Sequence, residues 1–222
     1  MHGGEFLTIE EAAKTLGVST RHARRLADSG ALGRVARGLI DRSTVDRYLQ
    51  SQRQGRTRTW AEHTAWAAVA MLAGQDADWL GATQSSRLRR TLRELTEVQD
   101  LLTRMRDRAR LHTFDAHRAA IPRLRSIVAT SSTRSLGIAH TIGDGIDGYI
   151  DAGEVDAVVR TLGLRASMNG AVTLRVTEFD VDRVRELVGS PVVAALDAAT
   201  STDPRMRGAG RRVLADVLDA YR

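Results

Sequence analysis

The apolar positions near the N-terminus predict two short helices joined by a tight turn. Thr8 and Glu11 have capping-box spacing, which marks the start of a helix, and Gly17 ends that helix. Ser19 caps a second helix, which runs to the residue before Gly30. Apolar side chains recur where two crossing helices bury them, at Ala12, Ala13, Leu16, Val18, Ala23, Leu26 and Ala27. The pattern therefore predicts a helix-turn-helix.

The residues after this motif predict a wing, a third helix and a domain boundary. Residues 34–40 alternate as a small hairpin does, and Ser43 caps a helix that runs to about Gln50. Residues 51–59 have no large apolar side chain and are typical of a linker. We therefore expect a helix-turn-helix domain at 1–50, a linker at 51–59 and a larger domain at 60–222.

The larger domain is expected to be mainly helical with a small sheet. Helices are predicted at 60–73, 181–187, 192–200 and 205–221, and a long helix at 86–111 follows from apolar residues at steps of three and four. Arginines cover the other faces of the long helix, but the acids among them are typical of a solvated face. Strands are predicted at 126–130, 137–142, 148–150 and 171–179. The fold class is thus mainly α with a small β component (α+β), and the N-terminal domain is a winged helix-turn-helix.

Charge is unevenly distributed along the chain. Residues 1–58 carry 11 Lys and Arg against 6 Asp and Glu, whereas residues 59–222 carry 22 against 21. The strongly basic N-terminal segment indicates a domain that binds a polyanion. The nearly neutral remainder indicates a second domain with a different function. The 32 arginines against 1 lysine suit phosphate and guanine recognition, although a GC-rich genome explains the same bias.

The second helix of the motif is the expected DNA-recognition helix. Its N-terminal residues Ser19, Thr20, Arg21 and His22 can reach base edges in the major groove. Arg24 and Arg25, with Arg34 and Arg37 of the wing, are expected to contact phosphates. The alternative is a solvated basic helix in an unrelated bundle.

No segment predicts a catalytic, cofactor or metal site. The sequence GDGIDG at 143–148 matches a dinucleotide fingerprint, but a strand follows it where a helix should, so we interpret it as a glycine-rich hairpin. Gly189, Ser190 and Asp203 resemble part of a nucleotidyltransferase motif, but Arg205 stands where the second carboxylate is needed. There is no cysteine, and His112 and His117 lack the spacing of a helical zinc pair. We therefore expect that the protein is not an enzyme and that it binds neither a metal nor a cofactor.

Two stretches of the chain resemble known families. Residues 7–49, with LTIEEAAKTLGVSTRHARRLADSGAL and LIDRSTVDRYLQ, resemble excisionase and MerR-like helix-turn-helix domains. Most of residues 60–218 resembles actinobacterial AbiEi-like antitoxins, through TWAEHTAWAAVAMLAG, DWL, SSRLRRTLREL, GAVTLRV and VVAALDAATSTDPRMRGAGRRVLADVL. The second resemblance implies an antitoxin that neutralises a nucleotidyltransferase toxin and represses its own operon.

The two family resemblances imply the partners that we expect for this protein. They are double-stranded DNA of the protein's own promoter and a co-encoded toxin, and a homodimer is compatible with the sequence. A transcription regulator without a toxin, or an excisionase-like recombination directionality factor, is the alternative function. No signal peptide or membrane-spanning run is visible, so we expect a cytoplasmic protein with no membrane partner.

Overall fold

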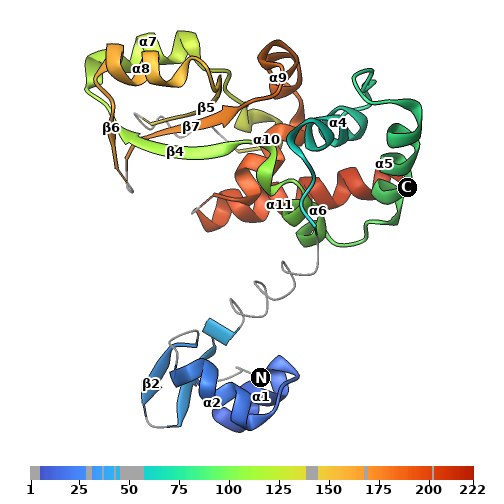
Figure 1. Ribbon diagram of the computed structural model, residues 1–222, viewed down its shortest axis with the longest axis vertical. Coiled ribbons are helices and arrows are strands. Elements are labelled where there is room, and N and C mark those ends of the chain that lie inside the picture. The colour runs from blue at the N-terminus through green and yellow to red at the C-terminus, as the bar shows by residue number, and fades with distance from the viewer. Residues whose placement is uncertain are drawn as a thin grey trace. The chain divides into compact units, whose positions relative to one another are not determined.

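The computed structural model describes residues 6–28, 32–36, 38–42, 44–45, 58–138, 145–167, 170–201 and 203–222. The chain divides into two compact units, Met1–Arg58 and Thr59–Arg222 (Figure 1). The fold is mainly helical with small sheets, as the sequence predicts. Among the described residues, no helix is both long and apolar enough to cross a bilayer.

The first unit is built around two short helices, α1 (Ile9–Leu16) and α2 (Thr20–Asp28). The predicted capping box is present, because the Glu11 N–H donates to Thr8 Oγ1 at 3.2 Å and the Thr8 N–H donates to Glu11 Oε2 at 2.8 Å. The Thr8 hydroxyl also donates to Glu11 Oε2, at 3.0 Å, and the donation from the Thr8 N–H and hydroxyl to this carboxylate lowers the pKa of Glu11. Gly17 ends α1 with a φ of 66°, a left-handed conformation that suits glycine, so only three residues separate the helices.

A small antiparallel sheet completes the first unit. Strands β2 (Arg34–Ala36) and β3 (Leu39–Asp41) form the predicted wing. Strand β1 (Phe6–Thr8), which the hydrophobic pattern does not reveal, pairs with the other edge of β3. Of the predicted third helix, Thr44 and Val45 are helical, as is Arg42 before the predicted cap, and Ser43 and residues 46–50 lie outside the described residues. The core of this unit buries four alanines and Ile9 of the two helices together with three residues that follow them: Ile9, Ala12, Ala13, Ala23, Ala27, Leu32, Ile40 and Val45.

The second unit contains a four-stranded mixed sheet in the order β5-β7-β4-β6. Its strands are β4 (Arg110–Asp115), β5 (Ile146–Asp151), β6 (Arg165–Ala166) and β7 (Val172–Thr177). Helices α7 (Ile121–Ile127) and α8 (Val155–Leu162) cover one face, where the alternate β7 residues Val172, Leu174 and Val176 are buried (Figure 1). Because side chains alternate along a strand, Thr173, Arg175 and Thr177 point to the opposite face.

Helices form the rest of the second unit. They are α4 (Glu62–Leu72), α5 (Ala82–Glu94), α6 (Val98–Arg104), α9 (Val181–Val188), α10 (Pro191–Ala199) and α11 (Pro204–Tyr221), with the 3₁₀ turns η1 (Arg106–Arg108), η2 (Arg118–Ala120) and η3 (Thr133–Leu136). Helices α4, α9, α10 and α11 match the four shorter helices predicted here, to within two residues at each end. Their apolar faces, including the fully buried Trp66 of α4, make a second and larger core.

The predicted long helix at 86–111 is wrong. The chain leaves the helical path after Glu94 and again after Arg104, and residues 110–115 form strand β4. The apolar spacing nevertheless identifies buried positions correctly. The buried residues are Leu88, Leu92, Leu95, Leu102, Met105 and Ala109. At the first break the Leu95 carbonyl accepts from Arg222 Nη2 at 3.2 Å, a partner that lies 127 residues later in the chain.

The strand predictions are confirmed at 148–150 and 171–179, which overlap β5 and β7. The strand predicted at 126–130 is wrong, because α7 continues to Ile127 and only Ala129 pairs, as a single bridge to Tyr149. Gly137 is a turn and Ile138 has no regular structure, and residues 139–142 of the strand predicted at 137–142 lie outside the described residues. Of the predicted glycine-rich hairpin, residues 143–144 lie outside the described residues, and residues 146–148 begin β5, which pairs with β7 in parallel.

A buried cluster of charged and polar side chains joins the sheet to the helices. Asp197 of α10 accepts hydrogen bonds at Oδ1 from Arg108 Nη2 at 2.7 Å and from the Tyr149 hydroxyl at 2.8 Å. Its Oδ2 accepts from Ser131 Oγ at 3.0 Å. Arg175 Nη1 of β7 lies 3.2 Å from Asp197 Oδ1, and the side chains of both arginines are about 5% exposed. The cluster therefore ties β5, β7 and η1 to one carboxylate of α10.

The charges of this cluster are balanced by a second carboxylate at its edge. Arg175 donates to both oxygens of Asp147, at 2.6 and 2.8 Å, and the Asp147 side chain is half exposed. The Arg108 carbonyl accepts from the buried indole N–H of Trp66 at 3.1 Å, which fixes η1 against α4. Two buried guanidinium groups thus face two carboxylates, the arrangement that makes burial of charge tolerable.

We expect Tyr149→Phe to lower the unfolding free energy by about 1–2 kcal/mol at neutral pH, because Asp197 loses a buried donor. Burial raises the pKa of the Tyr149 hydroxyl above its ordinary value near 10, although Arg108 opposes the shift. The unfolded chain therefore ionises first, and stability that is complete below about pH 10 is lost as the pH rises toward the folded-state pKa. Urea unfolding from pH 7 to 11 should show a flatter alkaline decline in the variant.

Tyr221→Phe, at the end of α11, is the matched control and should keep the alkaline decline of the wild type. Equal alkaline declines in Tyr149→Phe and wild type would contradict the assigned role of the Tyr149 hydroxyl.

Candidate DNA interface

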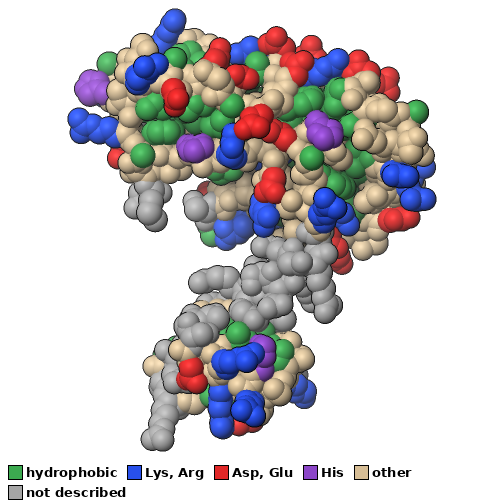
Figure 2. All heavy atoms as spheres, in the orientation of Figure 1, with side chains coloured by type: hydrophobic (Ala, Val, Ile, Leu, Met, Phe, Trp, Pro, Cys, Tyr) green, Lys and Arg blue, Asp and Glu red, His purple; other side chains and the backbone are tan. Residues whose placement is uncertain are grey.

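Helix α2 has one buried face and one basic face. Ala23 and Ala27 are buried against α1 and the wing, whereas Arg21, Arg24 and Arg25 are exposed. In Figure 2, Lys and Arg side chains gather beside a histidine on the visible face of the first unit. The two alanines lie four residues apart, so they share one side of the helix and leave the arginines on the other.

The N-terminus of α2 is capped and carries no acid. Ser19 Oγ accepts from the His22 N–H at 3.2 Å, and no acidic residue lies in the first turn of the helix. Ser19 and Thr20 are exposed at this end. Because the positive end of the helix dipole favours anions, this end suits a phosphate or the acceptor atoms of base edges.

His22 holds the side chain of Arg25. Arg25 Nη2 donates to His22 Nδ1 at 3.1 Å, which requires a neutral imidazole with its proton on Nε2. Arg25 is thereby positioned by a neighbour, while Arg21 and Arg24 form no ion pair with another described residue. The basic face thus presents three guanidinium groups that no acid in the described part of the first unit neutralises.

The wing residues are placed only in part. Arg34 begins β2, but the position of its side chain and the whole of Arg37 lie outside what the structure describes. Gly38 turns the hairpin with a φ of 83°, and Val35 and Leu39 are exposed on it. Of the predicted interface, the structure therefore brings Ser19, Thr20, Arg21, His22, Arg24 and Arg25 together on one helix.

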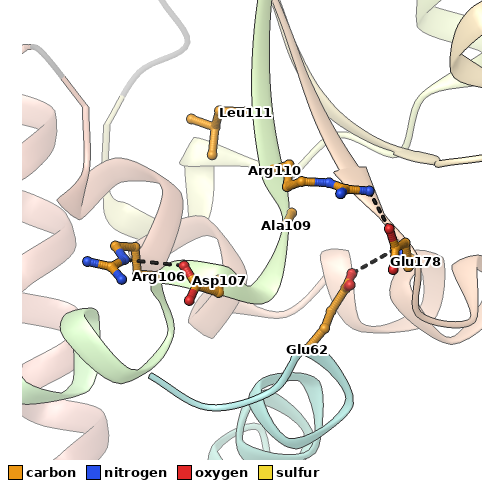
Figure 3. Close-up of a pocket in the computed structure, with 7 residues that line it drawn as sticks. All are labelled: Glu62, Arg106, Asp107, Ala109, Arg110, Leu111 and Glu178. Carbon is orange, nitrogen blue, oxygen red and sulfur yellow. Dashed lines mark hydrogen bonds and ion pairs between the residues drawn. The ribbon is translucent and has the colours of Figure 1, made fainter. Parts of the chain in front are cut away.

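A cavity of about 560 Å³ in the second unit is a different kind of site. Figure 3 shows its lining: Glu62, Arg106, Asp107, Ala109, Arg110, Leu111 and Glu178. Its charged groups pair with one another, Arg106 with Asp107 and Arg110 with Glu178. The carboxylate of Glu62 is occupied by the Glu178 N–H at 2.9 Å and the Thr177 hydroxyl. The lining therefore leaves few polar groups to bind a ligand.

The residues that resemble a nucleotidyltransferase motif are helix caps. Ser190 Oγ accepts from the Val193 N–H at the start of α10, and Asp203 Oδ1 accepts from the Arg205 N–H at 2.8 Å at the start of α11. In the described part of the chain, no group of three His, Asp or Glu side chains could hold a metal ion. Sequence reasoning missed Asp197, whose importance has no local signal because its partners come from four distant segments.

Comparison with known proteins agrees with the geometry of the first unit. A family model described as a helix-turn-helix domain matches residues 6–53. Neither the curated proteins nor the solved structures contain a match to the chain. The first unit is therefore a helix-turn-helix domain, a type of domain that typically binds DNA, and this indicates DNA as its partner.

We expect the variant carrying Arg21→Ala, Arg24→Ala and Arg25→Ala to lose binding to the protein's upstream DNA. Each lost base contact should weaken binding by about 1–3 kcal/mol, and each lost phosphate contact should flatten the salt dependence by about 0.9. Alanine suits an exposed helical position, so the domain should stay folded. Fluorescence anisotropy with a labelled promoter duplex and an unrelated duplex measures both effects.

Lys14→Ala, which removes an exposed cation from α1, is the control and should retain discrimination between the two duplexes. If the triple variant binds the promoter as tightly as wild type at about 150 mM salt, α2 is not the recognition helix.

Proposed function

We propose that the protein is a sequence-specific transcription regulator that represses its own operon. The observation that carries this proposal is the geometry of α2, which presents a capped N-terminus and three exposed arginines on a helix-turn-helix scaffold. Recognition helices of this motif enter the major groove with their N-terminal residues toward base edges. A homodimer would bring two copies of α2 to half-sites roughly 34 Å apart.

A reporter gene behind the protein's own upstream region tests this proposal. The wild-type chain should repress the reporter, and the Arg21, Arg24 and Arg25 alanine variant should not, because it lacks the contacts that hold it on the operator. Lys14→Ala should repress as wild type does. Equal repression by all three chains, at equal protein levels, would exclude α2 as the source of regulation. Activity only on the ends of an integrated element would favour the recombination directionality factor.

We further propose that the second unit makes this regulator an antitoxin against a nucleotidyltransferase toxin. The support is the resemblance of residues 60–218 to AbiEi-like antitoxins. The resembling segments include α4, α10 and α11, most of whose apolar residues lie in the larger core. The resemblance therefore bears mainly on how the second unit folds, and neutralisation would depend on the exposed residues that surround this core.

Co-expression separates the two roles. The full chain with the three α2 alanines is produced with the proposed co-encoded nucleotidyltransferase, both from foreign promoters, so that autorepression plays no part. We expect growth to be rescued as by wild type, because the substitutions leave the second unit unchanged. Failure of the variant where wild type rescues would place toxin control in the DNA-binding head, and failure of both chains would exclude the antitoxin role. A pull-down then distinguishes a direct complex from indirect antagonism.

A further inference from the structure

The exposed face of α5 is unusually basic for the nearly neutral unit that carries it. Residues 82–93 contain four arginines and no acid, and Glu94 is the last residue of the helix. The helix buries Ser85, Leu88 and Leu92, and all four arginines are exposed on its remaining faces. The acids expected among them, Glu97 and Asp100, fall outside α5 because the helix ends before they occur.

The four arginines of α5 are exposed and unpaired, as are seven other described arginines of this unit, but no other described helix carries four of them within seven residues. Arg106, Arg110 and Arg185 each form an ion pair with an exposed acid, and so do Arg183 and Arg222. By contrast, the guanidinium groups of α5 form no ion pair or hydrogen bond with another described residue. These four are Arg87, Arg89, Arg90 and Arg93. A polyanion is the partner that such a surface fits.

The spacing of these side chains forms a continuous strip. Arg87, Arg90 and Arg93 occur at steps of three, so they extend over about 9 Å of one side of the helix. Thr83 and Ser86 are exposed toward its start and add hydroxyl donors. Like charges three and four residues apart destabilise a helix. The arginine strip therefore destabilises α5 in the free protein, and an anionic partner would relieve this repulsion.

We propose that the arginine strip of α5 is a second DNA-binding surface, which contacts the phosphate backbone without reading sequence. The helix-turn-helix domain already brings the protein to duplex DNA, and guanidinium groups with hydroxyl donors are the groups that contact phosphates in protein–DNA complexes. In Figure 2 blue side chains lie at the right-hand edge of the second unit, where α5 runs in Figure 1. The second unit thereby adds affinity, and α2 supplies specificity.

The test uses the full chain with Arg87→Gln, Arg90→Gln and Arg93→Gln. Glutamine keeps a high helix propensity, so the helix should persist. Anisotropy with an unrelated duplex, measured over a range of salt, should show a slope of log K against log salt that is smaller by about 2.7, or 0.9 for each phosphate contact removed. The ratio of promoter to unrelated affinity should not change, and the melting temperature should equal or exceed that of wild type.

A control variant removes the same number of exposed charges from paired sites: Arg106→Gln, Arg110→Gln and Arg185→Gln. It should leave the salt slope as in wild type. Equal slopes in the α5 variant and wild type, or an equal loss in the control variant, would overturn the proposal. If wild type fails to discriminate its promoter but the α5 variant still loses slope, the proposed regulator is wrong and the α5 surface stands.

Two further probes exclude other anionic partners. Vesicles that contain phosphatidylglycerol and a polyglutamate peptide are titrated with wild type and with the α5 variant. Unchanged DNA binding by the variant, together with a loss of binding to either probe, would assign the strip to a membrane or an acidic protein and overturn the DNA assignment. Loss confined to duplex DNA supports it.

Discussion

The hydrogen bonds and ion pairs to the Asp197 carboxylate hold the second unit together. One carboxylate of α10 accepts from Arg108, Tyr149 and Ser131 and pairs with Arg175, so it joins strands β5 and β7 to α10 and η1. Each of the buried arginines would be costly alone, since a buried charge without a partner destabilises a fold by several kcal/mol. The position of β7 relative to α10 is therefore set by charge pairing as well as by apolar packing.

Ion pairs with acidic side chains also distinguish structural arginines from arginines that are available to bind another molecule. Arg108 and Arg175 are buried on carboxylates, and Arg110 and Arg185 are neutralised at the surface. The arginines of α2 and α5 lack acidic partners among the described residues, although one of them, Arg25, is positioned by a neutral histidine. Ion pairs thus distinguish the structural arginines of this arginine-rich chain from the arginines of α2 and α5.

The two units also divide the work of binding DNA. In the first unit, a core of alanines brings two short helices close together, and α2 can then present its arginines on a rigid support. In the second unit, a large aliphatic core supports α5, whose basic face has no sequence-reading geometry of its own. Specific contacts on one unit and charge contacts on the other are the two components of protein–DNA affinity.

The sequence by itself determined the helix-turn-helix, because its signals are local. Thr8 and Glu11 cap α1, Gly17 ends it, and Ser19 caps α2, each through partners within about four residues. The apolar spacing of residues 88–109 likewise identified buried positions but not the path of the chain. Only the tertiary structure decided that α5 ends at Glu94, where Arg222 satisfies the Leu95 carbonyl, and that Asp197 collects its partners from distant segments. Contacts between residues far apart in the chain leave no periodic pattern, so neither feature could be read from the sequence.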